Sequence, residues 1–564
     1  MIPESPAAIA GAVWADLGPV FDELLAEPVD AATVEGWLAR WSRLEEIVTE
    51  AISSAMIAYT CDTGDPAKEA AHRRFSIDIA PKAEEKSVKL AEKLVAAGHV
   101  RPGLEQMVAR FRRAIEIFRE ENVPLMAALE ETSTEYQGTT GAFLADWEGE
   151  KKPLPHLAPF LQSPDRSVRE RAFRATVTPY IETRDRLATL FDRQFELRQR
   201  VARNAGFTDF QSYAFAAKCR FDYSPEDCLR FHRAVEQAAV PAAERLHLFR
   251  KRRLGFERLR PWDLGVTLYR DQPLRPFQSG AELAAKALTV FSWLDGELAR
   301  EFRILIDEGL LDLDSRRNKA PGGYCDTLHF RGRPFIFMNA SGVLDDVNTL
   351  LHEAGHAFHA FASHQQRLIW QRHPTAEAAE LASMSMELLA APLLDAPSAF
   401  LSQRDAAIAR IEHLEDVLIT LCHVASIDSF QSWLYTSGEG GDQAARDAGW
   451  LAIRSRFDRG VDWDGLTTER IARWYRQLHI FLYPFYYIEY GIAQLGALQV
   501  WLNHRRDPGA ALDAYRRFLA KGATASIPEL YREAGARLVF DEVGMSELVA
   551  AVEIEIERLR ALVA

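Results

Sequence analysis

The sequence predicts a mainly α-helical protein with one small antiparallel β-ribbon. Apolar residues recur at three- and four-residue steps through almost every segment, which is the period of an amphipathic helix. One region alone, 322–339, has the aromatic and apolar runs bounded by turn residues that are typical of strands. The chain has 564 residues, of which 48% are hydrophobic and 26% charged, so we expect a soluble globular protein larger than one compact core.

The N-terminal half consists of predicted helices separated by turn signals. The expected helical runs are 32–57, 66–99, 104–121, 163–205 and 224–255. The stretch 141–155 contains Gly149, Pro153 and Pro155 and predicts turns or a short hairpin. After residue 375 the chain is expected to be helical to its end, apart from breaks near 437–441 and 460–465.

The predicted ribbon stands immediately before the most informative helix. Its strands, 322–330 and 335–339, flank a turn at 331–334. Asp345 and Asp346 then supply N-cap chemistry and negative charge for the first turn of a helix.

That helix carries the sequence H-E-x-x-H. His352 and His356 are four residues apart, so they lie one turn apart on the same helix face and can bind one zinc ion. Glu353 follows the first histidine, where its carboxylate can act on a metal-activated water. His359 shares this face, but a further ligand would remove the water position, so we expect a hydrogen-bonded core histidine there.

A third zinc ligand is expected on the next helix, 375–391. Glu377 and Glu380 both lie within reach, and spacing alone does not choose between them. Glu377 is near the helix start, where a solvated acidic face is the simpler interpretation. Glu380 and Glu387 are two turns apart beside a buried apolar stripe, where a carboxylate needs a partner. We therefore predict Glu380 as the ligand and Glu387 as an acceptor that orients a ligand histidine.

Composition excludes several other functions. The formal net charge is −14, which argues against nucleic acid or an anionic membrane as the main partner. The five cysteines are scattered and form no C-x-x-C, so neither a disulfide framework nor a thiolate zinc site is expected. The most apolar segment, 480–502, is interrupted by Pro484, Glu489 and Gln494, so no membrane span is predicted there. Without the basic region of a secretory signal at the N-terminus, we expect a cytoplasmic protein.

The motif segment 349–359 resembles the signature of the oligoendopeptidase F and thimet oligopeptidase family of zinc metallopeptidases. The segments 319–324 and 334–342, and Glu380-Leu381-Ala382-Ser383 followed by Glu387, are also similar to that family, with weaker likeness at 203–207 and 261–264. The resemblance implies one zinc ion held by His352, His356 and Glu380. It also implies two helical lobes around a deep substrate cleft, which we divide into an N-terminal region 1–195 and a catalytic region 196–564.

A tyrosine-rich segment at 479–490 is the second informative stretch. Tyr483, Tyr487 and Tyr490 are spaced i, i+4 and i+7, so we expect one stripe of a single helix. In the family that it resembles, a histidine and such tyrosines line the cleft, bind substrate and stabilise the tetrahedral intermediate. His479, Tyr487 and Tyr490 are therefore expected to be catalytic, and Tyr483 to bind substrate. The glycine-rich loop of the thimet branch is absent, which favours the oligoendopeptidase F branch.

Together these features predict a zinc-dependent endopeptidase that cleaves internal bonds of short unfolded peptides, with Glu353 as the general base. The ribbon, including Gly323 and Tyr324, is expected to bind the peptide backbone as an added strand. The alternatives are a dipeptidyl carboxypeptidase of the same superfamily and a non-catalytic helical binding protein. The sequence does not predict an oligomeric state.

Overall fold

The computed structural model describes residues 2–98, 102–270 and 274–563, and the chain divides into two compact units. Each unit is assembled from three separate stretches of sequence. Unit 1 comprises Met1–Glu116, Leu274–Ala409 and Ala493–Leu538, and unit 2 comprises Ile117–Pro273, Arg410–Ile492 and Val539–Ala564. The predicted boundary after residue 195 falls within a helix of unit 2, and the division into 1–195 and 196–564 stays a prediction.

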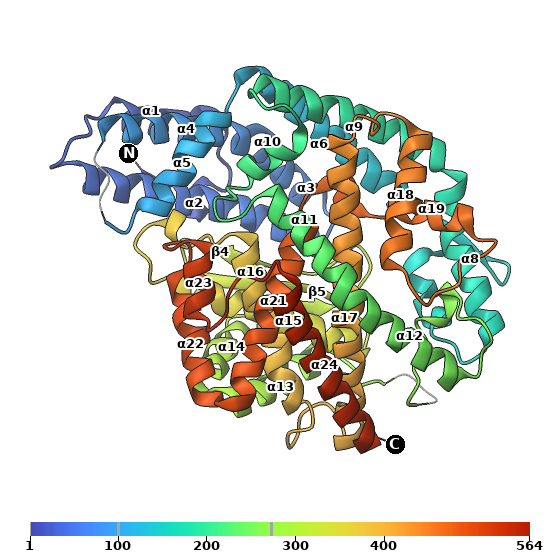
Figure 1. Ribbon diagram of the computed structural model, residues 1–564. Helices are drawn as coiled ribbons and strands as arrows, with labels where there is room; N and C mark the ends of the chain where they lie inside the picture. Colours follow the sequence, from blue (N-terminus) through green and yellow to red (C-terminus); the bar gives the residue numbers. More distant parts are fainter. Residues whose placement is uncertain (1, 99–101, 271–273, 564) are drawn as a thin grey trace. The chain divides into compact units, whose positions relative to one another are not determined.

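Helices make up most of both units, which confirms the predicted fold class (Figure 1). The α-helices of unit 1 are α1 (Trp14–Ala26), α2 (Val34–Cys61), α3 (Pro66–Arg73), α4 (Ala80–Ala97), α5 (Glu105–Ile117), α13 (Gly280–Leu294), α14 (Gly296–Asp307), α15 (Leu344–Ser363), α16 (Ala376–Ala390), α22 (Pro508–Lys521) and α23 (Ile527–Glu533). Those of unit 2 are α6 (Val123–Gly141), α7 (Ala158–Leu161), α8 (Arg166–Glu182), α9 (Arg184–Asn204), α10 (Phe210–Ala217), α11 (Pro225–Ala234), α12 (Val240–Leu254), α18 (Gln443–Phe457), α19 (Thr467–Tyr475), α20 (Leu478–Leu482) and α24 (Glu542–Val563). The unit boundaries fall inside α17 (Gln403–Thr436) and α21 (Tyr487–Arg506), and before the last residue of α5.

The helix predicted at 32–57 is α2, and its apolar stripe forms the centre of a core. Trp37, Trp41, Leu44 and Ile47 are completely buried against residues of α1 and α4. These side chains recur at three- and four-residue steps, so the helical period of the sequence was the signal of burial on one face.

Two of the long helical runs are interrupted where a proline follows. A π-helical turn at Arg74–Ile79 precedes α4, which has Pro81 in its first turn, and a second at Val235–Ala239 precedes α12, which begins with Val240-Pro241. Proline has no N–H to donate to the preceding turn, so the regular i→i−4 ladder cannot pass through it. The predicted runs 66–99 and 224–255 are therefore each two helices.

The two predicted hairpins are both present. In unit 2, β1 (Leu144–Trp147) pairs antiparallel with β2 (Glu150–Pro153). In unit 1, β4 (Tyr324–Leu328) pairs antiparallel with β5 (Arg333–Ala340), as expected for the ribbon. A third strand, β3 (Leu311–Asp314), was not predicted and runs parallel to β5 on its other side. The order β3-β5-β4 leaves β4 at an edge of this sheet.

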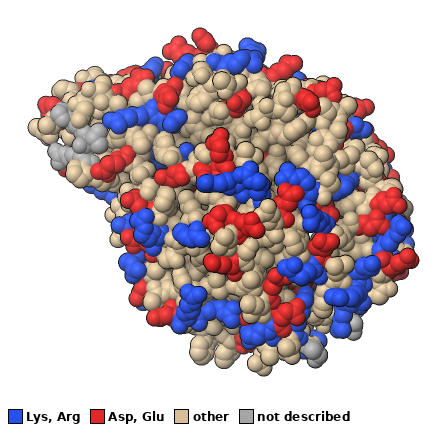
Figure 2. Space-filling view, viewed as in Figure 1, with Lys and Arg blue, Asp and Glu red and all other residues tan. Residues whose placement is uncertain are grey.

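One helix, α17, is long and apolar enough to cross a membrane by length and composition. Its most apolar window is 78% buried, as in the core helices of soluble proteins. The face of the molecule in Figure 2 carries basic and acidic side chains interspersed with one another.

Candidate active site

The helix that carries H-E-x-x-H, α15, begins at a strong cap. The Asp346 carboxylate accepts hydrogen bonds from the backbone N–H groups of Ser341, Gly342 and Val343, at 2.8, 2.9 and 3.0 Å. A negative charge here satisfies donors that a helix start leaves unpaired and suits the helix dipole. The cap thereby fixes where α15 begins after β5, as the acidic pair in the sequence predicted.

Gly355, between the two histidines, allows α15 and α16 to pack very closely. A Cβ atom at this position would lie 2.6 Å from the Cα of Ser383 and 2.9 Å from the carbonyl oxygen of Ala382. No side chain fits at such distances, so only glycine permits this approach of the two backbones. The contact brings Glu380, on α16, opposite the two histidines of α15.

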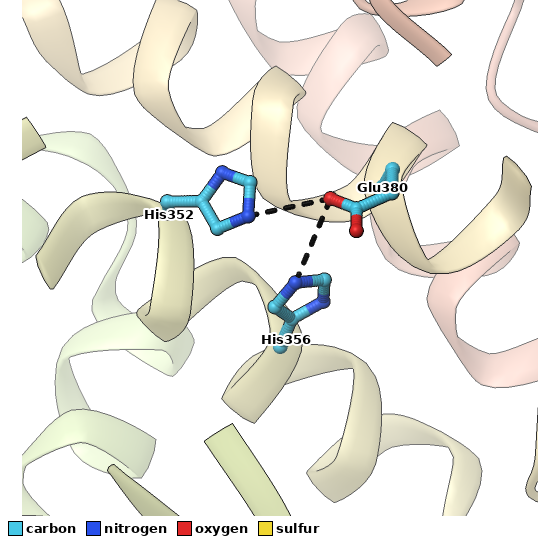
Figure 3. A group of neighbouring side chains, drawn as sticks. All are labelled: His352, His356 and Glu380. Atoms are coloured by element: carbon cyan, nitrogen blue, oxygen red, sulfur yellow. Dashed lines mark ion pairs between the residues drawn. The ribbon is translucent and has the colours of Figure 1, made fainter. Parts of the chain in front are cut away.

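His352, His356 and Glu380 converge on one point, as Figure 3 shows. The Oε2 atom of Glu380 lies 3.3 Å from His352 Nε2 and 3.8 Å from His356 Nε2. All three ligand atoms lie within 4.8 Å of one another, and the Glu380 side chain is only 6% exposed. Two imidazole nitrogens and a buried carboxylate oxygen thus face a common centre.

This donor set fits a zinc ion. Tetrahedral zinc with bonds of about 2.0–2.2 Å has ligand atoms roughly 3.3–3.6 Å apart; the Glu380–His352 distance lies in this range and the Glu380–His356 distance slightly above it. Two histidines and a glutamate are also an established ligand set for catalytic zinc, which keeps a fourth position for water. Burial lowers the pKa of His356 to about 4, so this imidazole is neutral and its lone pair is available to a metal.

Glu387 holds the first histidine from the opposite side. Its Oε1 atom lies 2.6 Å from His352 Nδ1, as expected for the acceptor predicted at this position. Burial by itself would lower the pKa of His352, but hydrogen bonds to Glu380 and Glu387 raise it well above its ordinary value. With Nδ1 committed to Glu387, Nε2 is the atom directed at the common centre.

Glu353 lies between α15 and the edge strand β4. It is 7% exposed, and burial raises its pKa to about 7 against the opposing charge of His352. The backbone of Cys325, in β4, opposes this rise in pKa more weakly. A Cβ at Gly323 would lie 3.9 Å from Glu353 Oε1, so the predicted substrate-binding glycine is directly beside this carboxylate.

Tyr324 uses its side chain inside unit 1. Its ring stacks on Phe337 with 4.9 Å between centroids, and its hydroxyl lies 2.6 Å from Thr60 Oγ1 on α2. The side chain therefore connects α2 to the sheet. Any contact of this residue with a peptide would involve its backbone.

Two expectations for this region were wrong. Glu377 is 2% exposed and not on a solvated face, in a part of α16 where the buried Tyr531 donates a hydrogen bond to the Glu377 carbonyl oxygen at 3.1 Å. His359 is buried as predicted, but neither of its ring nitrogens has a hydrogen-bond partner among the described residues. Burial lowers its pKa to about 3, and its ring packs against Phe518.

The tyrosine-rich segment of unit 2 is not the single helix that we predicted. Helix α20 ends at Leu482 and α21 begins at Tyr487, with Pro484 between them and Phe485 in the left-handed region at φ 62°. The missing N–H of proline and the left-handed residue break the helix, so Tyr483 shares no stripe with the later tyrosines.

The break nevertheless gathers the tyrosines around His479. The His479 ring lies 4.8 Å from that of Tyr487 and 5.8–6.0 Å from those of Tyr483, Tyr486 and Tyr490, between centroids. Tyr483 is the most exposed of the group at 54%. Within unit 2 the segment is thus a cluster of four phenols around one imidazole, and Tyr486 is a member that the sequence pattern did not select.

Buried polar groups hold the break in place. Arg198 donates to the carbonyl oxygens of Ile480 and Phe481, and the N–H of Phe485 donates to Gln431 Oε1 at 2.8 Å. These partners lie on α9 and α17, far from the segment in sequence, so no local sequence pattern predicted them.

Comparison with known proteins identifies the family of this chain. The model of Peptidase family M3 matches residues 160–549. The chain belongs to peptidase family M3. It is 22% identical over 414 residues to the oligopeptidase PepF of Bacillus subtilis, a match that covers 71% of this chain and 58% of that protein. It is 23% identical over 434 residues to an oligoendopeptidase F homolog of Borreliella burgdorferi, covering 73% of this chain and 70% of that one.

Solved structures of the family share the fold. A structure of PZ peptidase A with an inhibitor is 27% identical, covers 97% of this chain and 98% of that chain, and superposes with a TM-score of 0.90. The oligoendopeptidase F of Enterococcus faecium is 17% identical with a TM-score of 0.65, a likeness of fold alone. The expected resemblance to the oligoendopeptidase F family is confirmed.

Proposed function

We propose that the protein is a zinc-dependent oligoendopeptidase that hydrolyses internal bonds of short, unfolded peptides. The observation that carries this proposal is the cluster of His352, His356 and Glu380 with the Glu353 carboxylate beside it. Membership of peptidase family M3 and the names of the relatives support the reaction class. One zinc ion per chain, held by the two histidines and Glu380, would polarise the scissile carbonyl and acidify a water molecule.

Glu353 is the general base in this proposal. Its carboxylate takes a proton from the attacking water and delivers it to the leaving amine nitrogen, so that one group serves both proton transfers. Burial of the side chain, at 7% exposure, restricts the orientations open to the carboxylate. Glu387 orients His352 through the hydrogen bond at Nδ1.

The peptide substrate binds along the edge strand β4 as an added strand. An edge strand offers unpaired backbone groups, which bind a peptide with little demand on its sequence. Gly323, beside Glu353, leaves room for the scissile bond, and the backbone of Tyr324 continues the edge.

His479 and the surrounding phenols supply hydrogen bonds to the oxyanion and to the peptide. Imidazole and phenol groups are suitable donors to developing negative charge. Their gathering around one ring within unit 2 supports a shared role, with His479, Tyr487 and Tyr490 acting on the reacting group and Tyr483 contacting substrate.

We place this activity in the cytoplasm, on free peptides and without a membrane or nucleic-acid partner. The burial of the apolar window of α17 supports the absence of a membrane partner, and the net charge of −14 argues against nucleic acid.

The test is digestion of a peptide blocked at both ends by the purified protein, with its zinc content measured. We expect stoichiometric zinc, cuts at internal bonds, and loss of cleavage on chelation that zinc restores. Removal of C-terminal dipeptides from an unblocked peptide, with the blocked one intact, would instead identify a dipeptidyl carboxypeptidase. Absence of both zinc and cleavage would leave a non-catalytic binding protein.

A further inference from the structure

The hydroxyl of Tyr487 has a defined hydrogen-bond partner within unit 2. Its oxygen lies 3.2 Å from Oε1 of Gln477, in the turn before α20. The ring of His423, on α17, packs edge-on against the Tyr487 ring with 5.4 Å between centroids. Tyr487 thus contacts side chains from two other segments, those of Gln477 and His423.

The position of the proton on the His423 ring follows from a neighbouring arginine. Nη1 of Arg454 lies 3.3 Å from His423 Nδ1, and a guanidinium can only donate. Nδ1 must therefore carry a lone pair, and the proton of the neutral imidazole must be on Nε2. Arg454 is itself fixed, since its Nε donates to Asp458 at 2.9 Å. Burial and the charge of Arg454 lower the pKa of His423 to about 3, in keeping with a neutral ring.

The amide of Gln477 is oriented by a backbone acceptor. Its NH2 donates to the carbonyl oxygen of Arg473 at 3.4 Å, so the oxygen and not the NH2 faces Tyr487. The same oxygen accepts the proton of Tyr487. The Tyr487 phenol therefore directs its only proton at Gln477 and cannot donate it elsewhere while this bond is intact.

We propose that Gln477 is a positioning residue that holds the Tyr487 ring against His479, with the His423 ring packed against the same tyrosine. The two rings meet edge to face with 4.8 Å between centroids, so a change in the tilt of Tyr487 changes the space open to the imidazole. Tyr487 then acts through its position, and the proton given to the oxyanion comes from another member of the cluster. This inference rests on the proposed function, and it replaces the role on the reacting group assigned above to Tyr487 with a positioning role.

The test compares four variants with the wild type on the blocked peptide: Gln477→Met, Gln477→Glu, Tyr487→Phe and the double variant Gln477→Met/Tyr487→Phe. Methionine matches the length of glutamine without a comparable acceptor, glutamate keeps an acceptor oxygen, and phenylalanine removes the hydroxyl alone. Gln477→Met and Tyr487→Phe should each lower kcat about threefold to tenfold with KM unchanged, because each removes the same hydrogen bond. The double variant should be no slower than the slower single variant, and Gln477→Glu should retain most of the wild-type kcat.

Several results would overturn the proposal. These are an unchanged kcat in Gln477→Met, losses that multiply in the double variant, a loss confined to KM, or a drop of a hundredfold or more in Tyr487→Phe alone. The last result would mean that the hydroxyl itself acts on the reacting group. If Gln477→Met fails to fold, Gln477→Glu and Tyr487→Phe still decide, since the first must stay active and the second must lose no more than about tenfold. All values are ratios to the wild type, so a failure here leaves the proposed function intact, whereas an inactive wild type would refute that function itself.

Discussion

Replacing Glu387 should weaken zinc binding without touching a metal ligand. In the Glu387→Leu variant, His352 Nδ1 loses an acceptor at 2.6 Å that is itself largely buried, with 17% of its side chain exposed. A hydrogen bond to a charged group contributes about 1.5–3 kcal/mol. This range corresponds to a roughly 10- to 100-fold rise in the dissociation constant for zinc, which is also the usual effect of losing such a partner.

A competing effect moves the expectation toward the lower end of that range. The hydrogen bond to Glu387 also raises the pKa of His352, so the variant imidazole gives up its proton more easily to make room for a metal. We therefore expect about a tenfold weaker affinity near neutral pH, and a smaller loss in Glu387→Gln, which keeps an acceptor oxygen.

The assay is titration of metal-free protein with zinc against a chelating dye. The matched control is Glu308→Gln, which removes one carboxylate from unit 1, where it pairs with Arg333 at 2.8 Å, and should bind zinc like the wild type. Equal affinities of Glu387→Leu and the wild type would refute the assigned role of Glu387.

Three further predictions follow from single contacts. Glu380→Ala should reduce bound zinc below one per chain after dialysis, because two imidazoles alone hold zinc weakly; full retention would exclude Glu380 as a ligand. Gly323→Val should keep zinc but lower kcat/KM by about tenfold or more, since its methyl groups extend beyond a Cβ already 3.9 Å from Glu353 Oε1; unchanged turnover would separate β4 from the substrate. Arg169→Met should lower the free energy of unfolding by about 1.5–3 kcal/mol in urea titrations, because it removes a buried charged hydrogen bond to Asp263 while Arg166 still pairs with that carboxylate; a shift in midpoint too small to resolve would contradict this.

Much of the candidate active site could be predicted from local sequence. The two histidines and Glu353 lie on one helix, so a four-residue spacing was enough to bring them together. The contacts of Glu380 and Glu387 with His352 could be anticipated because an apolar stripe beside them predicted burial, and a buried carboxylate needs a partner; their roles as ligand and orienting acceptor stay predictions. The β4–β5 ribbon was visible as two short apolar runs around a turn.

The errors arose where distant residues or a neglected local signal decided the outcome. Glu377 is buried, and its carbonyl oxygen accepts a hydrogen bond from Tyr531, 154 positions away in the chain, a contact that no pattern in α16 predicts. Strand β3 has four residues, two of them aspartates, so its pairing with β5 was not visible as a strand pattern. The break before Tyr487 did have a local signal, since Pro484 disfavours a continuous helix, but the spacing of the tyrosines was given more weight.

The organisation into units is the least local feature. Each unit combines three stretches of chain, and α17 and α21 contain unit boundaries, so no change in composition marks the transitions. A linear division of the sequence cannot express such an arrangement.

The Glu353→Gln variant tests the central claim most directly. Glutamine keeps the size of the side chain and leaves the three metal-binding side chains intact, but it cannot accept a proton from water. The proposal predicts one zinc per chain, as in the wild type, and a kcat on the blocked peptide lower by about 100- to 10,000-fold. Cleavage at the wild-type rate by a variant freed of any wild-type contamination would contradict a mechanism in which Glu353 is the general base.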